Sequence, residues 1–335
     1  MTERALFLLL FLLALFPRGL LLGERPPFWF DEDWTFEVGT APLGEAWQKL
    51  VEEDFHPPLS YLLLGLWARL LGLFGVENEV PLRLLPALLG SLVGPVLFLA
   101  LRERGLPPPF AFLGGSLWAF LPQALLQDVE FRMYPLAALL VALSLLGAAR
   151  GSFRLWALWV GLALYTHYLA GTVALSLGLR FGIRRALLPL LAFLPWLPAV
   201  AHQASKVHQL YHWNQDPYAR LKEMLLLLYG APDPLFLPLG ALFWGLALLG
   251  LLLERQALLP FVLAVGLLFA LGFQPISPRY LPVLLPVLVY GAGVAAWRLR
   301  LPGAVLLLAL NLSWWALLPW TALMRLATSW PGLLP

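Results

Sequence analysis

Long apolar runs separated by short polar stretches fill this sequence, and this pattern constrains the fold most strongly. A helix of roughly 20 apolar residues spans a bilayer. Hydrophobic residues make up 61% of the chain and charged residues only 12%, against a charged share of roughly 25% in soluble proteins. The pattern predicts an all-α polytopic membrane protein whose chemistry must lie in loops and helix ends. The runs fall near residues 5–22, 58–75, 82–101, 107–127, 134–149, 155–168, 169–181, 186–201, 235–253, 257–273, 280–297 and 301–319.

The start of the chain and its composition exclude several classes of protein. The apolar run that follows Met1–Arg4 is not followed by a small-residue cleavage site, so we expect an uncleaved first transmembrane helix that begins in the cytoplasm. The chain has no cysteine, which excludes disulfide bonds and thiolate metal sites. The net charge of +3 does not indicate a nucleic-acid partner, because basic residues gather in the cytoplasmic loops of membrane proteins.

Clusters of basic residues alternate with acidic or histidine-bearing loops and predict the topology. If segment 58–75 crosses the membrane, every later basic cluster falls outside; if it lies along the interface, all of them fall inside. In the second arrangement the inner loops carry 11 basic and 3 acidic residues, and the outer side carries 11 and 16 with all five histidines. Because cytoplasmic loops are rich in Lys and Arg, we predict eleven spanning helices, with a crossing 58–75 as the alternative. The clusters are Arg102/Arg104, Arg150/Arg154, Arg180/Arg184/Arg185, Arg255 and Arg298/Arg300.

The first outer loop, residues 23–57, contains three successive acids, Asp31, Glu32 and Asp33, between aromatic residues. The apolar residues of 36–53 have helical spacing and predict a helix on the membrane surface. Acids at such a surface are costly unless they have a purpose or partners, and one carboxylate could act as a general base. The alternative is a solvated acidic turn that keeps the loop out of the bilayer.

Further polar residues fall on the same predicted face. The planar fork of Arg132 suits a phosphate, although Glu130 and Arg132 could instead form a helix-end ion pair. His167 lies where two short helices meet, and is either a ligand or a structural residue. Arg279 opens the helix 280–297, where it and the positive helix end favour an anion; the alternative is an interfacial anchor.

The loop 202–233 carries several aromatic residues and three of the histidines. His208 and His212 lie one helical turn apart, which is a spacing that could bind a metal. No acid stands at the positions that a metalloprotease motif needs. We therefore expect an amphipathic lid over a pocket in preference to a metal site.

The topology rests on charge alone, yet it gathers the candidate residues on one face of the membrane. A carboxylate base with one or two arginines, open sideways to lipid, suits a phosphate leaving group on a lipid tail. The gathered residues are Asp31, His56, Glu130, Arg132, His167 and Arg279.

Six motifs in order resemble those of the GT-C superfamily of integral membrane glycosyltransferases. The nearest branch is that of dolichyl-phosphate-mannose protein mannosyltransferases and lipid A aminoarabinose transferases. The resemblance reaches to about residue 297 and implies a single GT-C transmembrane domain, residues 1–335, with the catalytic motif in loop 23–57 and an interfacial helix after it. The motifs are Trp29–Trp34, His56-Pro57-Pro58, Arg83–Pro86, Glu130–Tyr134, Tyr165–Tyr168 and Pro278–Tyr280.

The resemblance implies an inverting transfer of a hexose or pentose from a polyprenyl-phosphate donor. The acceptor is a lipid, glycan or protein on the outer face of a bacterial-type cytoplasmic membrane. Asp31 matches the family's catalytic base, and Glu130 matches a second functional acid. The residues expected to contact the donor or its phosphate are Glu32, Asp33, His56, Arg83, Arg132, Tyr134, His167, Arg279 and Tyr280.

The resemblance also implies that no cofactor is needed, since members that use monophosphate donors generally need no metal; a divalent cation stays open. Two departures from the family pattern matter. The additional Asp33 competes with Asp31 as the base, and the chain lacks the large C-terminal soluble domain with which some relatives recognise the acceptor.

Two other functions remain as alternatives. A transporter of lipid-linked sugars would need polar groups along a path through the bilayer and often has internal repeats, but we find no repeat and few ionisable residues inside the apolar runs. A non-catalytic membrane partner could keep the fold without the chemistry.

Overall fold

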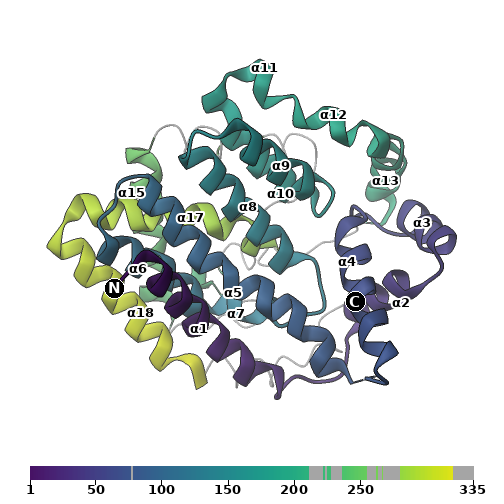
Figure 1. Cartoon of the computed structure of the whole chain (residues 1–335), viewed down its shortest axis with the longest axis horizontal. Helices are drawn as coiled ribbons and strands as arrows, with labels where there is room; N and C mark the ends of the chain where they lie inside the picture. The colour runs from purple at the N-terminus through teal and green to yellow at the C-terminus, as the bar shows by residue number, and fades with distance from the viewer. Residues whose placement is uncertain are drawn as a thin grey trace.

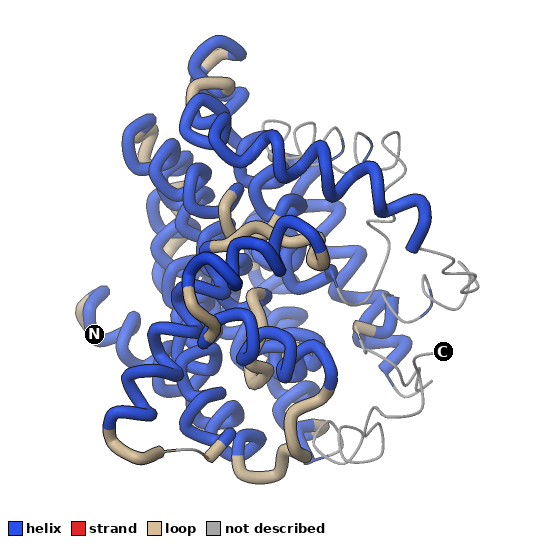
Figure 2. Tube along the Cα trace, turned by 90° about the vertical axis from the view of Figure 1, so that its right-hand side faces the viewer, coloured by secondary structure: helices blue, strands red, loops and turns tan. Residues whose placement is uncertain are grey.

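The computed structural model describes residues 1–76, 78–210, 222, 225–227, 236–254, 262, 266 and 280–319. Within these residues the chain forms helices joined by short turns, and no strand is present (Figure 2). The all-α prediction is therefore confirmed for the described part of the chain. The helices of the first half are α1 (Glu3–Leu22), α2 (Phe30–Thr40), α3 (Leu43–Glu52), α4 (Leu59–Leu73), α5 (Glu79–Glu103), α6 (Pro108–Phe120), α7 (Pro122–Asp128) and α8 (Tyr134–Ala149). Those of the second half are α9 (Phe153–Leu164), α10 (Tyr168–Ser176), η1 (Leu177–Phe181), α11 (Ile183–Ala186), α12 (Pro189–Phe193), η2 (Leu194–Trp196), α13 (Leu197–Leu210), α15 (Leu237–Leu253), α17 (Leu281–Leu299) and α18 (Leu301–Ala316).

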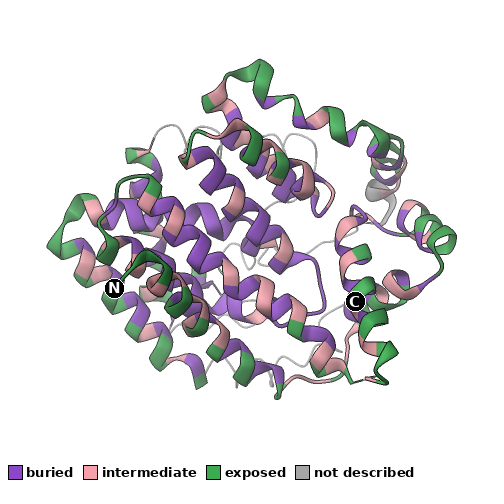
Figure 3. Ribbon diagram, viewed as in Figure 1, coloured by how far each residue is buried: buried purple, intermediate pink, exposed green. Residues whose placement is uncertain are grey.

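The centre of the molecule is a bundle of apolar helices, with α17 most deeply placed. Every residue from Leu281 to Ala296 is buried, as expected for a helix that is apolar on all sides. Helix α5 packs against both α1 and α8 (Figure 1), and the buried residues concentrate along α5, α8 and α17 (Figure 3).

The outside of the bundle is also apolar. In α1, Leu8, Leu12, Phe16 and Leu20 are all exposed, and their spacing of four residues places them on one face of the helix. A continuous row of exposed apolar side chains is unfavourable in water and marks a contact surface. This face is suited to lipid, as in a helical membrane protein.

Helix lengths give only part of the predicted span count. Four segments are long and apolar enough to cross a membrane: α1, α5, residues 183–206 and α17. Helices α6 and α7 make a fifth when taken together, although they meet at 57°. This bend follows from Pro122, because a proline disfavours helical geometry in the residue before it. The remaining apolar helices are shorter, so the count of eleven spans stays a prediction; the predicted span 257–273 lies outside the described residues except for 262 and 266.

At one end of the bundle, arginines of the predicted cytoplasmic clusters form ion pairs with acidic residues at other helix ends. These pairs join the start of α1 to the end of α5, the end of α5 to the residue after α8, and the loop after α5 to the end of α15. The pairs are Arg102–Glu3, Arg150–Glu103 and Arg104–Glu254, with N–O distances of 2.8, 2.8 and 2.9 Å.

Residues 23–57, the predicted first outer loop, contain two helices, where the sequence indicated one that begins near Phe36. Helix α2 begins at Phe30 and includes the three acids, and the chain breaks at Ala41–Pro42 before α3. Pro42 explains the break, since a proline has no backbone N–H and restricts the residue before it. Helices α2, α3 and α4 lie together at one end of the bundle (Figure 1).

Helices α2 and α4 touch through two glycines. A Cβ atom at Gly65 would lie 2.0 Å from the carbonyl oxygen of Gly39, which no side chain can tolerate. The opposite face of α4 exposes Leu62, Leu66 and Leu70. An apolar helix with one face on the protein and one face open fits the predicted non-crossing segment, but whether it crosses the membrane stays a prediction.

Candidate active site

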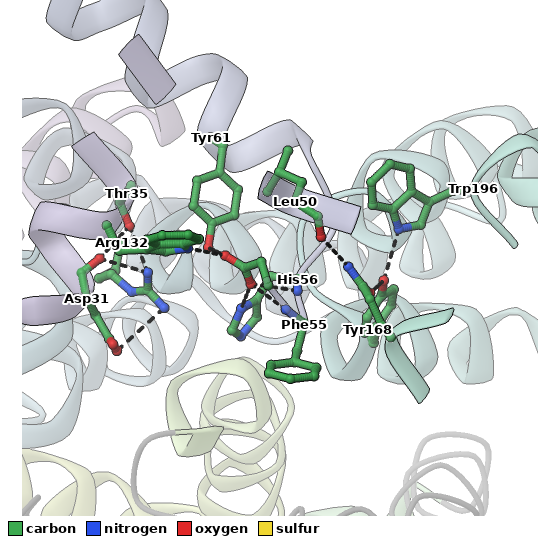
Figure 4. A network of polar contacts seen from close by, with 12 residues as sticks. Asp31, Thr35, Leu50, Phe55, His56, Tyr61, Arg132, Tyr168 and Trp196 are labelled. Atoms are coloured by element: carbon green, nitrogen blue, oxygen red, sulfur yellow. Dashed lines mark hydrogen bonds and ion pairs between the residues drawn. The ribbon is translucent and has the colours of Figure 1, made fainter. Parts of the chain in front are cut away.

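The first turn of α2 and the loop before α8 meet at Asp31 and Arg132. The Arg132 guanidinium donates to the backbone carbonyl of Asp31 at 2.9 Å and to the Thr35 hydroxyl at 2.7 Å. A second guanidinium nitrogen lies 3.6 Å from the Asp31 carboxylate, whose side chain keeps 15% of its exposure while that of Arg132 keeps 3%. Figure 4 shows both side chains turned toward each other. The predicted acid and the predicted phosphate ligand are thus adjacent.

Glu32, one position later, points into the protein and is fully buried. It accepts two hydrogen bonds from Arg83, at 2.8 and 2.7 Å, one from Arg25 at 3.0 Å and one from the backbone N–H of Phe131 at 2.7 Å. Burial raises the pKa of Glu32, but the charges of Arg25 and Arg83 and these hydrogen bonds outweigh it and lower the pKa. Glu32 therefore ties α2 to α5 and to the loop that carries Arg132.

Arg83 is shared between Glu32 and the loop before α2. It also donates to the carbonyl of Pro26 at 3.0 Å, and its guanidinium lies 4.8 Å from the ring centre of Phe28. Only 1% of its side chain is exposed. All these described contacts of Arg83 are within the protein, so its expected contact with a donor stays a prediction.

Glu130 and Asp33 differ sharply in their surroundings. Glu130 is buried and accepts from Arg25 at 2.6 Å, and its ion pair with Arg132 stays a prediction. Asp33, in the first turn of α2, is exposed. Desolvation and the negative charges of Glu79 and Glu32 raise its pKa.

The residues just before α4 form a compact turn around Asp54. One carboxylate oxygen accepts from Nδ1 of His56 at 2.7 Å and from the backbone N–H of His56 at 2.9 Å. The other accepts from the Tyr61 hydroxyl at 2.6 Å and from the Trp34 indole at 2.5 Å (Figure 4). Burial raises the pKa of Asp54, but the charge and hydrogen bonds of His56, with those of Tyr61 and Trp34, outweigh it and hold the pKa well below its usual range.

His167 caps α10 and faces the same place. Its Nδ1 accepts from the backbone N–H of Leu169 at 3.2 Å, as an N-cap side chain does. Its ring centre lies 5.7 Å from that of His56, 5.8 Å from that of Tyr134 and 5.7 Å from that of Tyr280. Burial lowers the pKa of His167 well below the ordinary value, and so do the charge of His56 when that ring is protonated and the charge of Arg132.

Helices α3, α10 and α13 are joined beside this cluster by a chain of hydrogen bonds (Figure 4). The Tyr168 hydroxyl donates to the Gln203 side chain at 2.5 Å and accepts from the Trp196 indole at 2.9 Å, and Gln203 donates to the carbonyl of Leu50 at 2.8 Å. The start of the expected lid 202–233 thus belongs to α13, which packs on α3. Most of that loop, with His212 and the side chain of His208, lies outside the described residues.

The structure therefore brings together most residues that the sequence singled out. Asp31, Arg132, His56, His167, Tyr134 and Tyr280 share contacts or neighbours, whereas Arg279 lies outside the described residues. Sequence reasoning missed Asp54 and Arg25. The sequence Asp54-Phe55-His56 before two prolines gave a usable signal for the first, because Asp commonly accepts from backbone two residues on.

A buried ion pair in the bundle was also missed. Arg18 of α1 and Asp128 at the end of α7 are both fully buried, with their side chains 2.5 Å apart. An ionisable residue inside an apolar run indicates a partner, so Arg18 itself was a signal, although its spacing from Asp128 was not.

Among the described residues, no three His, Cys, Asp or Glu side chains gather in a way that could hold a metal ion. The expectation that no cofactor is needed stays a prediction.

No protein-family model matches the sequence, and no curated protein does. Solved structures do match. ArnT from Cupriavidus metallidurans, in its apo state, matches 89% of this chain with 21% identity and a TM-score of 0.55. The Archaeoglobus fulgidus oligosaccharyltransferase, in a complex with Zn and sulfate, matches 97% of this chain with 14% identity and a TM-score of 0.56.

The chain spans 61% and 53% of the lengths of these two proteins. The described part of this chain therefore shares the all-helical fold of these two proteins, in agreement with the expected fold. At these identities the likeness concerns the fold.

Proposed function

On the premise of a GT-C fold, we propose that this membrane protein is an inverting glycosyltransferase that uses a polyprenyl-phosphate sugar. The observation that carries the proposal is the adjacency of the Asp31 carboxylate and the Arg132 guanidinium, 3.6 Å apart. A general base and a phosphate ligand are the two groups that this transfer requires. Asp31 belongs to a helix end beside an apolar bundle, where a lipid tail can lie between helices while its phosphate meets polar groups.

In the proposed reaction Asp31 takes the proton from a hydroxyl or amine of the acceptor. The acceptor atom bonds to the anomeric carbon of the sugar from the face opposite the phosphate, and the carbon–oxygen bond to the phosphate breaks. The electron pair of that bond leaves with the polyprenyl phosphate, and Arg132 stabilises the charge that develops there. Opposite-side attack inverts the anomeric centre.

We assign the neighbouring residues to supporting roles. Glu32, Arg25 and Arg83 fix α2 against α5 and so hold Asp31 at the start of its helix. Glu130, which we propose as a second functional acid, is kept in place by Arg25. Tyr280, at the start of α17, would face the donor at the outer side of the membrane, and we propose Arg279, which precedes it in the sequence, as a further donor or phosphate contact.

The proposal is tested by asking which class of sugar donor the protein uses. Membranes that contain the protein are given a panel of polyprenyl-phosphate sugars, hexoses and pentoses, with radiolabel in the sugar. Release of label from the lipid into an acceptor supports the proposal. Passage of intact labelled lipid across proteoliposomes without transfer would favour the transporter, and neither transfer nor passage would favour a non-catalytic partner.

A further inference from the structure

Two histidine rings face each other in the candidate active site, and each has one nitrogen occupied by the protein. The rings of His56 and His167 are 5.7 Å apart between centres and inclined by 44°. A neutral imidazole carries one N–H donor and one acceptor nitrogen, and the bond made by one nitrogen determines the role of the other. The protein contacts therefore set what each ring can offer to a ligand.

The contacts of His167 make its Nε2 a donor. Nδ1 accepts from the backbone N–H of Leu169 and so carries no proton. The proton of the neutral ring is then on Nε2, and this atom is buried without a hydrogen-bond partner among the described residues. A buried unsatisfied donor costs about 1–3 kcal/mol. A donor kept in this position at such a cost is suited to a ligand that supplies the acceptor.

The contacts of His56 make its Nε2 an acceptor. Its Nδ1 lies 2.7 Å from Asp54, and an ionised carboxylate only accepts, so Nδ1 donates. The Nε2 of the neutral ring is left with its lone pair. Asp54 is itself held by Trp34 and Tyr61, which prevents it from turning away from His56.

We propose that His56 and His167 act as an acceptor–donor pair that recognises one hydroxyl group of the bound sugar, with Asp54 as the positioning residue that fixes the tautomer of His56. This inference rests on the proposed function. A hydroxyl both donates and accepts, so it satisfies Nε2 of both rings. A phosphate oxygen without a proton only accepts and would leave the acceptor of His56 unsatisfied.

The walls of the pair suit a sugar ring. Tyr134 and Tyr280 stand beside His167 at ring-centre distances of 5.8 and 5.7 Å. Aromatic rings offer an apolar face to the carbon–hydrogen side of a ligand while leaving polar edges for its hydroxyls. The cation that suits the phosphate, Arg132, is a separate group that contacts Asp31 and Thr35.

The first test examines the tautomers without any substrate. The full chain in lipid nanodiscs, labelled with ¹⁵N-histidine, is measured by NMR above the ordinary histidine pKa of about 6.5. We expect the proton of His56 on Nδ1 and that of His167 on Nε2. Asp54→Asn should change the His56 signals and leave those of His167. His202→Gln, at an exposed histidine of α13, serves as assignment control. A proton on Nδ1 of His167 or on Nε2 of neutral His56 overturns the inference.

The second test measures recognition. The polyprenyl-phosphate sugar that the enzyme turns over is compared with its singly deoxygenated analogues. For the wild-type enzyme, one analogue should have a kcat/KM about 10- to 100-fold lower than the complete sugar, which is the loss expected when buried polar groups lose their partner. For His167→Ala, the same analogue should differ much less from the complete sugar. His167→Gln keeps an N–H donor and should retain the preference.

The outcomes separate the two proposals. If transfer occurs but every analogue loses the same factor in wild type and His167→Ala, the pair does not recognise a hydroxyl and only this inference fails. If no donor of the panel is turned over, the proposed function fails, and the NMR spectra alone decide whether the acceptor–donor pair exists.

Discussion

Arg132 contacts Asp31 at two places, through a hydrogen bond of 2.9 Å to its backbone carbonyl and through the approach of a guanidinium nitrogen to 3.6 Å from its carboxylate. The hydrogen bond fixes the position of the arginine relative to the first turn of α2. Glu32, the next residue, is buried and accepts from Arg83 at 2.8 and 2.7 Å. Of these two adjacent acids, Glu32 is committed to structure, and we propose Asp31 for the chemistry.

Replacing Arg132 should weaken transfer even when the positive charge is kept. Arg132→Lys loses the planar fork that binds both a phosphate and the Asp31 carbonyl, and we expect kcat/KM to fall about 10²-fold or more, in line with the loss of one electrostatic contact to a developing charge. Steady-state transfer kinetics measure this. Arg69→Lys on α4, whose guanidinium donates to the carbonyl of Ala41, is the matched control and should fall much less. Equal losses in both variants would contradict a role of Arg132 at the phosphate.

The Glu32→Gln protein should unfold more easily than wild type. The substitution removes the buried counter-charge of Arg83 and one of the two buried carboxylates that Arg25 contacts, and breaking a buried ion pair on one side costs about 3–5 kcal/mol. Thermal unfolding in detergent should show a large drop in Tm, with activity lost in proportion to the folded fraction. A Glu32→Gln protein that melts like wild type yet fails to transfer would place Glu32 on the substrate instead.

The glycine contact between α2 and α4 offers a test of how the acidic motif is positioned. Gly65→Ala inserts a Cβ 2.0 Å from the carbonyl of Gly39, and overpacking of this kind costs about 1–3 kcal/mol. Because the helix that carries Asp31 must shift, transfer should fall as well. Gly72→Ala in the same helix meets no atom within 4 Å and should be neutral or stabilising by up to about 1 kcal/mol. Similar thermal shifts for the two variants would contradict the described packing.

The lowered pKa of His167 predicts a specific dependence of stability on pH. The groups that face it are His56 from the turn before α4, Arg132 and Tyr134 at the start of α8, and Tyr280 at the start of α17. The unfolded chain binds a proton at this histidine below about pH 6.5 while the folded protein does not, so its contribution to stability is present above that pH and is lost as the pH falls toward the folded pKa.

The free energy of unfolding of wild type and of His167→Gln, measured across pH, checks this pH dependence. The stability of wild type relative to the variant should be constant above about pH 7.5 and should then decline by up to about 1.4 kcal/mol per pH unit below about pH 6.5. A difference that stays constant down to pH 5 would show that His167 titrates normally, contrary to its buried position.

Much of this fold follows from local sequence, because apolar run length and proline position act locally. The runs at 134–149 and 280–297 correspond closely to α8 and α17. The partners of buried charges could not be derived in this way. Glu32 of α2 meets Arg83 of α5 across 51 residues, and Arg18 of α1 meets Asp128 of α7 across 110. Only the tertiary arrangement of these helices brings the partners together.

The candidate site shows the same division. Periodicity and charge indicated Asp31, Arg132, His56 and His167 as polar groups at one face. Their roles depend on contacts that a sequence does not contain, such as the N-cap bond that sets the proton of His167.

The most direct measurement compares transfer from the polyprenyl-phosphate panel by wild type, Asp31→Asn and Asp33→Asn, each checked for membrane insertion and Tm. Asp33 is the matched control, since it lies in the same helical turn but is exposed. We expect label to leave the lipid with wild type and Asp33→Asn, and transfer by Asp31→Asn to fall at least about 10²-fold with an unchanged Tm. An Asp31→Asn protein that is folded and transfers at the wild-type rate would contradict the assignment of Asp31 as the base.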